Sequence, residues 1–320
     1  MKQFGVGVVG AGIMGRRMMA ALQLHPRFRV AALWDAVPQA ARMAQQAQAA
    51  AQQAGAVRCA ASLDALVNDP EVELVYIASP PAFHLEGVRS ATAARRACLC
   101  EKPLAHTVAD ALAMRELVAN SGLPFAVHFP LARSEAANQL LALVHGGRLG
   151  KVERASLTLR FARWPRAWQQ AASGWLAGPE EGGFTREVMS HFVFLAHRLF
   201  GPAVVEELQL ERAPGETETR LLAQLVHASV RLSIDAAVGG DLADYNRFEV
   251  IGQQDRAALT GWSRLEHRGQ TSEPGNAMPA TLDGLAAMLE GRTDHGLASV
   301  HEALAVALCV ESMLRDPLHQ

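Results

Sequence analysis

The stretch Gly10-Ala11-Gly12-Ile13-Met14-Gly15 directly follows the apolar run Phe4–Val9 and opens a segment of helical pattern, Met14–Leu24. In this strand–turn–helix context, a GxGxxG string predicts a dinucleotide-binding turn. The first glycine permits the tight turn, the second lets the backbone approach a pyrophosphate, and the third lets the helix pack on the strand. The helix N-terminus also offers N–H groups and a partial positive charge to phosphates. The alternative is an ordinary glycine-rich turn, but the context favours cofactor contacts from Gly10, Ala11, Gly12, Ile13 and Met14.

Around this turn, residues 1–125 alternate short apolar runs with helical segments, which is typical of βαβ units and a parallel sheet. The expected strands are Phe4–Val9, Val30–Trp34, Leu74–Ile77, Ala97–Cys100 and Phe125–His128. The expected helices are Met14–Leu24, Gln39–Ala54 with Gly55 as its C-cap, Leu85–Ala94 and Val108–Asn120. We therefore predict an α/β fold whose first domain, residues 1–125, is a Rossmann dinucleotide-binding domain with a doubly wound parallel sheet.

From about Val152 the pattern changes to longer runs of alternating apolar and polar residues, which suit a largely antiparallel sheet with one face covered. These runs are Val152–Arg163, Val204–Arg212, Thr219–His227, Ser229–Ala237, Phe248–Ile251 and Ala257–Thr260. Helices are expected at Phe184–Phe200, Ala280–Leu289 and Ser299–Leu314. Residues 126–320 are therefore predicted to form a second α+β domain on a largely antiparallel open sheet.

The composition argues against several classes of protein. The 320 residues are 50% hydrophobic and 19% charged, so the chain can bury a core, and its formal charge of −2 leaves no basic excess for nucleic acid. Four scattered cysteines suit neither a disulfide framework nor a zinc site that begins with CxxC. The sequence has no recognisable export signal and no apolar stretch of about 18 residues, so we expect a cytoplasmic protein that does not enter membranes.

Asp35 ends the second expected strand, 20 residues after Gly15. An acidic side chain at this point can accept hydrogen bonds from both ribose hydroxyls of an adenosine, and it would repel a 2′-phosphate. Ala36 follows, where an arginine would suit NADP. Arg16, just after the glycines, is the counter-argument, although an arginine there is more often solvated. The sequence favours NAD over NADP.

Two further motifs follow later strands: Ser79-Pro80-Pro81-Ala82-Phe83-His84 and Glu101-Lys102-Pro103. With the glycine turn, they resemble the Gfo/Idh/MocA family of nicotinamide-dependent oxidoreductases. The resemblance covers essentially the whole chain and continues through Arg148-Leu149-Gly150-Lys151-Val152 and Phe248-Glu249-Val250-Ile251-Gly252. It implies cofactor contacts from Ser79, Pro80, His84, Glu101 and Lys102, although the first of these motifs also suits a proline-stiffened strand exit.

In that family the lysine of the EKP motif lies beside the nicotinamide and hydrogen-bonds the reacting oxygen of the substrate, which implies a catalytic role for Lys102. An ammonium at the carboxyl end of a parallel strand can protonate a developing alkoxide, whereas an arginine cannot give up its proton. Of the 30 basic residues only Lys2, Lys102 and Lys151 are lysines, so a lysine at this point favours chemistry over generic charge. The alternative is a surface pair of Glu101 with Lys102.

The family's second motif is a glycine run followed by an aspartate and, four residues later, a histidine. The stretch Glu181-Gly182-Gly183-Phe184-Thr185-Arg186-Glu187-Val188-Met189-Ser190-His191 is similar, with glutamates at the first and the acidic positions. Glu187 and His191 share one face of the expected helix, where a carboxylate can orient an imidazole for acid/base work. The resemblance implies that His191 relays a proton, and the longer Glu187 is expected to orient it. No third ligand has suitable spacing, so we predict no metal.

The substrate-side candidates are Arg133, Trp168 and Arg186. Indole faces suit the C–H surface of a sugar and guanidinium groups suit a carboxylate or phosphate, but packing between domains or subunits is an equal alternative for the tryptophans. The resemblance also implies a homodimer or homotetramer that forms through the sheet of the second domain.

The sequence therefore predicts an NAD-dependent oxidoreductase that transfers a hydride between the nicotinamide and a carbonyl or secondary alcohol of a sugar-like or polyhydroxylated small molecule. Two rivals stay open. One is a cofactor-binding sensor without turnover, supported by the altered glycine–acid motif. The other is a glycosidase that uses NAD for transient oxidation, as a branch of the family does.

Overall fold

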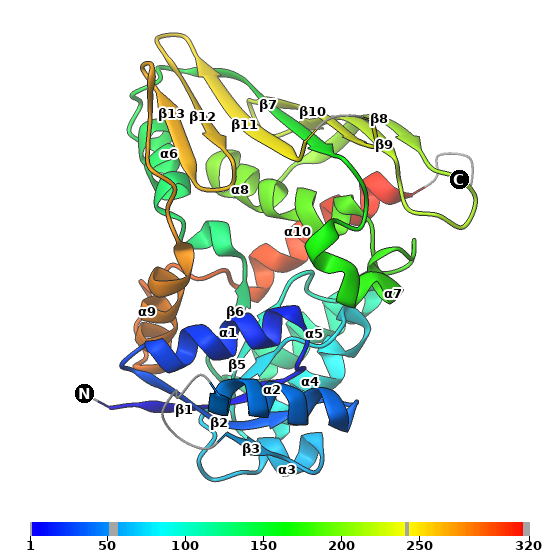
Figure 1. Cartoon of the computed structure of the whole chain (residues 1–320). Helices are drawn as coiled ribbons and strands as arrows, with labels where there is room; N and C mark the ends of the chain where they lie inside the picture. Colours follow the sequence, from blue (N-terminus) through cyan, green and yellow to red (C-terminus); the bar gives the residue numbers. More distant parts are fainter. Residues whose placement is uncertain (1, 51–56, 241–242, 316–320) are drawn as a thin grey trace. The chain divides into compact units, whose positions relative to one another are not determined.

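The computed structural model describes residues 2–50, 57–240 and 243–315 of the chain (Figure 1). The chain forms two compact units. The first combines Met1–His128 with Met278–Leu304, and the second combines Phe129–Ala277 with Ala305–Gln320. Among the described residues, no helix has both the length and the apolar character that a membrane span needs.

The first unit is built on a six-stranded parallel sheet in the order β3-β2-β1-β4-β5-β6. The strands are β1 (Phe4–Val9), β2 (Phe28–Trp34), β3 (Arg58–Cys59), β4 (Leu74–Ile77), β5 (Ala97–Glu101) and β6 (Phe125–His128). Every residue of β1, β4 and β5 is buried, as expected for parallel strands covered on both faces. The strand order reverses between β1 and β4, and doubly wound sheets bind ligands at such a switch point, outside the carboxyl ends of the strands.

The connections of this sheet are mostly helical. They are α1 (Ile13–Leu24), α2 (Pro38–Ala50), α3 (Leu63–Val67), α4 (His84–Ala93) and α5 (Val108–Ser121). The ends of α5 show why the sequence forms a helix here: the Thr107 side chain accepts a hydrogen bond from the Asp110 N–H, and Gly122 ends the helix at φ +63°. The expected helix Gln39–Ala54 is α2, and its predicted end at Gly55 lies outside the described residues.

The first unit also includes a segment from late in the sequence. Helix α9 (Ala277–Leu289) places Leu282, Leu285 and Met288 in the same buried cluster as Met18 and Leu22 of α1. The predicted boundary therefore differs from the structure, because β6 and residues 278–304 belong to the first unit and were assigned to the second domain. A period of 3.6 residues reveals that α9 has an apolar face, but not which core that face covers.

The second unit contains an eight-stranded sheet in the order β14-β13-β12-β11-β7-β10-β9-β8. Its pairs are antiparallel except β7–β10, which is parallel. The strands are β7 (Val152–Phe161), β8 (Val204–Glu211), β9 (Arg220–Val226), β10 (Arg231–Val238), β11 (Tyr245–Gly252), β12 (Arg256–Thr260), β13 (Arg264–His267) and β14 (Gln270–Thr271). This sheet and the Rossmann sheet confirm the predicted fold class.

Helices α6 (Glu135–His145) and α8 (Ser190–Phe200) pack on one face of this sheet. The ring of Phe192 on α8 stacks on Phe248 of β11, with 6.4 Å between centroids. The helix expected over Phe184–Phe200 begins instead with a π-helical turn, Thr185–Met189, before α8. The second unit also contains the short α7 (Ser173–Leu176) and the end of α10 (Val300–Leu314).

Candidate functional site

The glycine turn between β1 and α1 gives each of its three glycines a different environment. Gly10 has φ +100°, and a Cβ there would lie 2.7 Å from the Ala78 carbonyl. A Cβ on Gly15 would lie 1.9 Å from the Gly10 carbonyl oxygen, so only glycine lets α1 pack this close to the strand. A Cβ on Gly12 would meet no described atom within 4 Å. The turn thus has the geometry of a phosphate-binding turn, with open space at the glycine that a pyrophosphate approaches.

The N-terminus of α1 adds to this turn. Gly12 is the N-cap residue, no side chain caps it, and the first turn carries no acidic residue. The early N–H groups of the helix therefore keep their capacity to donate to an anion, and the helix dipole favours negative charge there.

Asp35 braces the same turn from the end of β2. One carboxylate oxygen accepts a hydrogen bond from the Ala11 N–H at 2.7 Å, and the other accepts one from the Val37 N–H at 2.8 Å. Each carboxylate oxygen has a second lone pair, so contact with a ribose remains open to this half-buried side chain. Its role in choosing NAD stays a prediction.

The segment after β4 carries Ser79 and His84. The Ser79 hydroxyl oxygen is buried and has no hydrogen-bond partner among the described residues, which suits an acceptor or donor supplied by a ligand. His84 is only 1% exposed; its Nε2 lies 3.0 Å from the Ser79 carbonyl and its Nδ1 lies 3.0 Å from the Pro103 carbonyl. Burial lowers the pKa of His84, partly offset by hydrogen bonds to these carbonyls and by the charge of Glu101. His84 therefore ties the segments after β4 and β5 together, and its predicted cofactor contact remains untested.

The EKP motif lies at the end of β5, and the side chain of Glu101 contacts residues of both neighbouring strands. Its Oε1 accepts hydrogen bonds from the Tyr76 hydroxyl on β4 at 2.5 Å and from His128 Nδ1 on β6 at 2.7 Å. Its Oε2 accepts the Lys102 N–H at 3.3 Å. Glu101 is 5% exposed, whereas Lys102 is half-buried. Neither Tyr76 nor His128 was predicted as part of the site, because only the parallel register brings them to Glu101.

In the second unit, the glycine pair before the π-helical turn is required by its surroundings. A Cβ on Gly182 would lie 2.1 Å from the Leu176 carbonyl oxygen. Gly183 has φ +93°, and a Cβ there would lie 2.4 Å from a carboxylate oxygen of Glu218. That buried carboxylate accepts the Thr185 N–H at 2.6 Å. Burial raises the pKa of Glu218, against the hydrogen bonds from Thr185.

Glu187 lies in the π-helical turn and His191 in the first turn of α8. His191 is 8% exposed, and its ring meets Phe129 and Trp262 edge-on, with centroids 5.9 and 5.5 Å away. Isolated π turns within helices frequently occur at functional sites. The acid/base role of His191 and the orienting role of Glu187 stay predictions.

The three substrate-side candidates have different surroundings. Arg186 donates to Glu311 through Nε at 2.6 Å and Nη2 at 3.0 Å, and through Nη1 to the carbonyls of Pro179 and Gly182. These four bonds engage most of its five N–H donors, so Arg186 holds the glycine segment against α10. Trp168 is 45% exposed, and Arg133 is half-buried after a short 3-10 helix.

Trp262, whose ring centroid lies 5.5 Å from that of His191, was not predicted. Trp262 has φ +72°, an uncommon value for a large residue, and its N–H donates to the Asn246 side chain at 3.0 Å. The guanidinium of Arg166 lies 4.8 Å from the Trp168 ring and 6.0 Å from the Trp262 ring. The signal for Trp262 in the sequence is weak, because it consists only of a tryptophan that follows Gly261 in a hairpin.

Comparisons with known proteins bear on both units. Residues 4–129 match the GFO_IDH_MocA family, described as an oxidoreductase family with an NAD-binding Rossmann fold. The chain is 27% identical over 213 residues to levoglucosan dehydrogenase of Pseudarthrobacter phenanthrenivorans, covering 63% of this chain and 52% of that protein. It is 33% identical over 165 residues to dTDP-3,4-didehydro-2,6-dideoxy-alpha-D-glucose 3-reductase of Streptomyces violaceoruber, covering 51% of this chain and 45% of that one. The matched part thus spans about half the length of these relatives.

Solved structures share the fold over nearly the full chain. An oxidoreductase from Thermotoga maritima has a TM-score of 0.85 at 17% identity, covering 98% of this chain and 96% of that chain. Aldose-aldose oxidoreductase from Caulobacter crescentus has a TM-score of 0.80 at 21% identity, with the same coverage. These likenesses establish the two-sheet architecture.

Proposed function

The chain belongs to the Gfo/Idh/MocA family, and from this premise we propose that it is an NAD-dependent oxidoreductase acting on a carbonyl or secondary alcohol. The substrate is a sugar-like or polyhydroxylated small molecule. The names of the two curated relatives, a levoglucosan dehydrogenase and a dTDP-sugar reductase, support a carbohydrate substrate.

The observation that carries the proposal is the glycine turn. Gly10 and Gly15 are required by the backbone around them, while Gly12 faces open space at the N-terminus of α1. The buried Ser79 hydroxyl lies after β4, the neighbour of β1 across the switch point of the sheet. These residues fit a dinucleotide, with the glycine turn and α1 holding the pyrophosphate and Asp35 the adenosine ribose. When bound, the nicotinamide supplies the carbon that accepts or donates the hydride.

Lys102, His191 and Glu187 are proposed for the proton chemistry. In the oxidation direction, Lys102 holds the substrate oxygen while the hydroxyl proton leaves, His191 carries that proton onward, and Glu187 orients the imidazole. The carbon that carries this oxygen also gives up its hydride, so a carbonyl forms. In the reduction direction the same groups return the proton to the developing alkoxide. Arg133 and Trp168 are proposed substrate contacts, whereas Arg186 is assigned to structure because Glu311 and two carbonyls engage its guanidinium.

The experiment that tests this function follows absorbance at 340 nm while the protein is supplied with NAD and a panel of sugars, inositols and diols. NADH formation with a stoichiometric carbonyl product is expected. Cleavage of a glycoside without net NADH would indicate the glycosidase chemistry instead. Tight cofactor binding with no turnover on any substrate, in either direction, would indicate a sensor.

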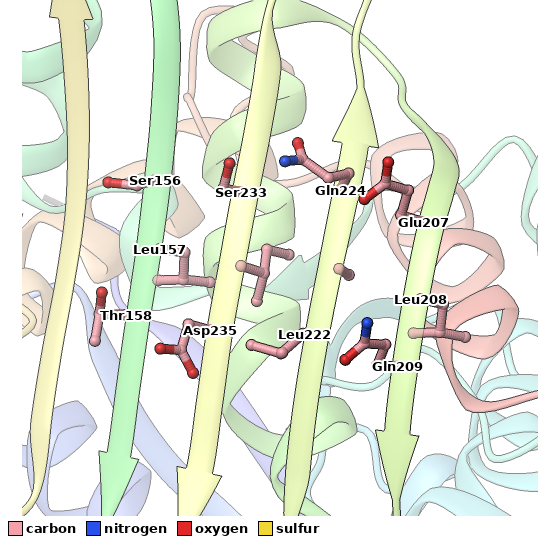
Figure 2. A pocket seen from close by; sticks show the side chains of 12 residues that line it. Ser156, Leu157, Thr158, Glu207, Leu208, Gln209, Leu222, Gln224, Ser233 and Asp235 are labelled. Carbon is pink, nitrogen blue, oxygen red and sulfur yellow. The ribbon is translucent and has the colours of Figure 1, made fainter.

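We also propose that two copies of the chain pair through the face of the second sheet opposite α6 and α8. This face carries a shallow groove of about 350 Å³ over β7, β10, β9 and β8 (Figure 2). Small polar side chains such as Ser156, Thr158 and Ser233 make it flat enough for a second sheet to approach. Light scattering should show a dimer or tetramer, and Ser233→Arg should shift it toward monomer. A wild-type monomer at micromolar concentration would contradict the pairing.

A further inference from the structure

We propose that Glu101 is a positioning residue for Lys102, and that Tyr76 and His128 hold it in place from inside the sheet. The inference rests on the proposed function, because the position of Lys102 affects catalysis only if its ammonium meets the substrate. Neither Tyr76 nor His128 has a role in that function as stated above.

The register of three neighbouring strands creates the cluster. Tyr76 of β4 pairs with Leu99 of β5, and Glu101 lies two residues further along, on the same side of the strand. Glu101 itself pairs with His128 of β6. Donors from both flanking strands therefore converge on one carboxylate oxygen, at 2.5 Å from the Tyr76 hydroxyl and 2.7 Å from His128 Nδ1.

This carboxylate is ionised although it is buried. Burial alone would raise the pKa of Glu101, but the charge and hydrogen bond of His128, the hydrogen bond of Tyr76 and the charge of Lys102 together lower it. Burial and the Glu101 charge raise the pKa of Tyr76 far above its usual value, so the phenol stays a donor. Breaking such a buried charged network by removing one partner is costly, which makes its geometry stiff.

The two carboxylate oxygens of Glu101 have different hydrogen-bond partners. Oε1 is anchored by Tyr76 and His128, which leaves Oε2 directed at the Lys102 N–H, 3.3 Å away. The carbonyl of Pro103, on the other side of Lys102, lies 3.0 Å from His84 Nδ1. The backbone of Lys102 is therefore tied on both sides. The charge of Lys102 in turn contributes to the lowered pKa of Glu101.

Amine labelling tests the positioning of Lys102 without a substrate. The chain has three lysines, so trace acetylation at pH 7.5 followed by peptide mass spectrometry reports Lys102 with Lys2 and Lys151 as internal references. In Glu101→Gln the labelling of Lys102 relative to Lys151 should rise about threefold or more, because the carboxylate that holds the Lys102 N–H is gone and the side chain becomes more accessible. Glu101→Asp, which keeps the charge, should stay near wild type. An unchanged ratio in Glu101→Gln would overturn the inference.

Kinetics on an identified substrate test the positioning part. Glu101→Gln should lower kcat about tenfold with the KM for NAD nearly unchanged, and Tyr76→Phe should lower it severalfold. Tyr245→Phe removes the chain's other tyrosine hydroxyl, on an exposed side chain of β11, and serves as the matched control. In a Lys102→Ala background, Glu101→Gln should cost less than twofold more, since it acts through the missing ammonium.

The outcomes separate the two claims. Full turnover in Lys102→Ala would refute the proposed role of Lys102 itself. A large loss in Lys102→Ala combined with an equal cost of Glu101→Gln in both backgrounds would leave that role intact and overturn the positioning inference. If Glu101→Gln does not fold, as judged by thermal melting, Tyr76→Phe in both backgrounds decides the same question.

Discussion

The glycines of the nucleotide turn differ in the space that surrounds a Cβ atom at each position. A side chain on Gly12 would project into open space, whereas one on Gly15 would collide with the Gly10 carbonyl at 1.9 Å. The same kind of substitution therefore tests ligand binding at one position and folding at the other.

We expect Gly12→Val to abolish NAD binding while leaving the melting temperature within a few degrees of wild type. Gly12 has φ −68°, which valine tolerates, so the added side chain obstructs only the pyrophosphate. Gly15→Val is the matched comparison and should fail to fold or melt far lower. Calorimetric titration with NADH and a thermal melt are sufficient, and wild-type affinity in Gly12→Val would place the nucleotide elsewhere.

Asp35 governs the second prediction at this scale. NAD(H) should bind more tightly than NADP(H). A cofactor with a 2′-phosphate loses hydrogen bonds from the ribose hydroxyls to Asp35, and its phosphate is repelled by the carboxylate. Asp35→Ser with Ala36→Arg should move the preference toward NADP. Because the carboxylate also accepts the Ala11 N–H at 2.7 Å, both affinities should fall in absolute terms. Tighter NADPH binding by the wild-type protein would contradict the assignment.

At the scale of elements, local patterns predicted most of the fold. The Rossmann strands and helices were readable because each βαβ unit combines a buried apolar run with a helical period. The two-residue strand β3, with both residues exposed, left no such signal. The π-helical turn before α8 was read as an α-helix because its hydrogen bonds span only one residue more than those of an α-helix, a difference that a short apolar pattern does not reveal. The Tyr76–Glu101–His128 cluster needs the strand register, which no motif encodes.

Helix α8 also carries a pH-dependent element. Burial, together with His227, lowers the pKa of His197 to about 4, and neither ring nitrogen has a hydrogen-bond partner among the described residues. The unfolded chain takes up this proton as the pH falls below about 6.5, while the folded protein does so only near 4. The contribution of the neutral His197 side chain to the free energy of unfolding is therefore complete above about pH 6.5, and it is lost progressively as the pH falls toward 4.

We expect the free energy of unfolding in urea to fall between pH 7.5 and 5.0, with His197 contributing up to about 1.4 kcal/mol per pH unit. His197→Phe keeps a ring beside His227 but removes the titration, so it should flatten this dependence. Burial lowers the pKa of His227 and of His84 as well, so part of the slope should remain. An identical slope in the variant would refute the contribution of His197.

At the scale of the whole molecule, the chain order conceals how the units are assembled. In the sequence, all strands of the second sheet lie between β6 and α9. Nevertheless, β6 and α9 both belong to the first unit. Lys102 belongs to the first unit, and His191 and Glu187 belong to the second. The predicted domain limits differ from these units at residues 126–128 of β6 and at residues 278–304, the segment that returns to the core of the first unit.

The most direct test of the proposed chemistry is the effect of Lys102→Ala on turnover relative to its effect on NAD binding. We expect NAD affinity within a few-fold of wild type and a loss of turnover of about a hundredfold or more, the scale of a lost positioned acid. Lys102→Arg should fail nearly as badly, since a guanidinium keeps the charge but not a transferable proton. Near-normal turnover in Lys102→Ala on an identified substrate would contradict the account and leave His191 as the sole acid/base group.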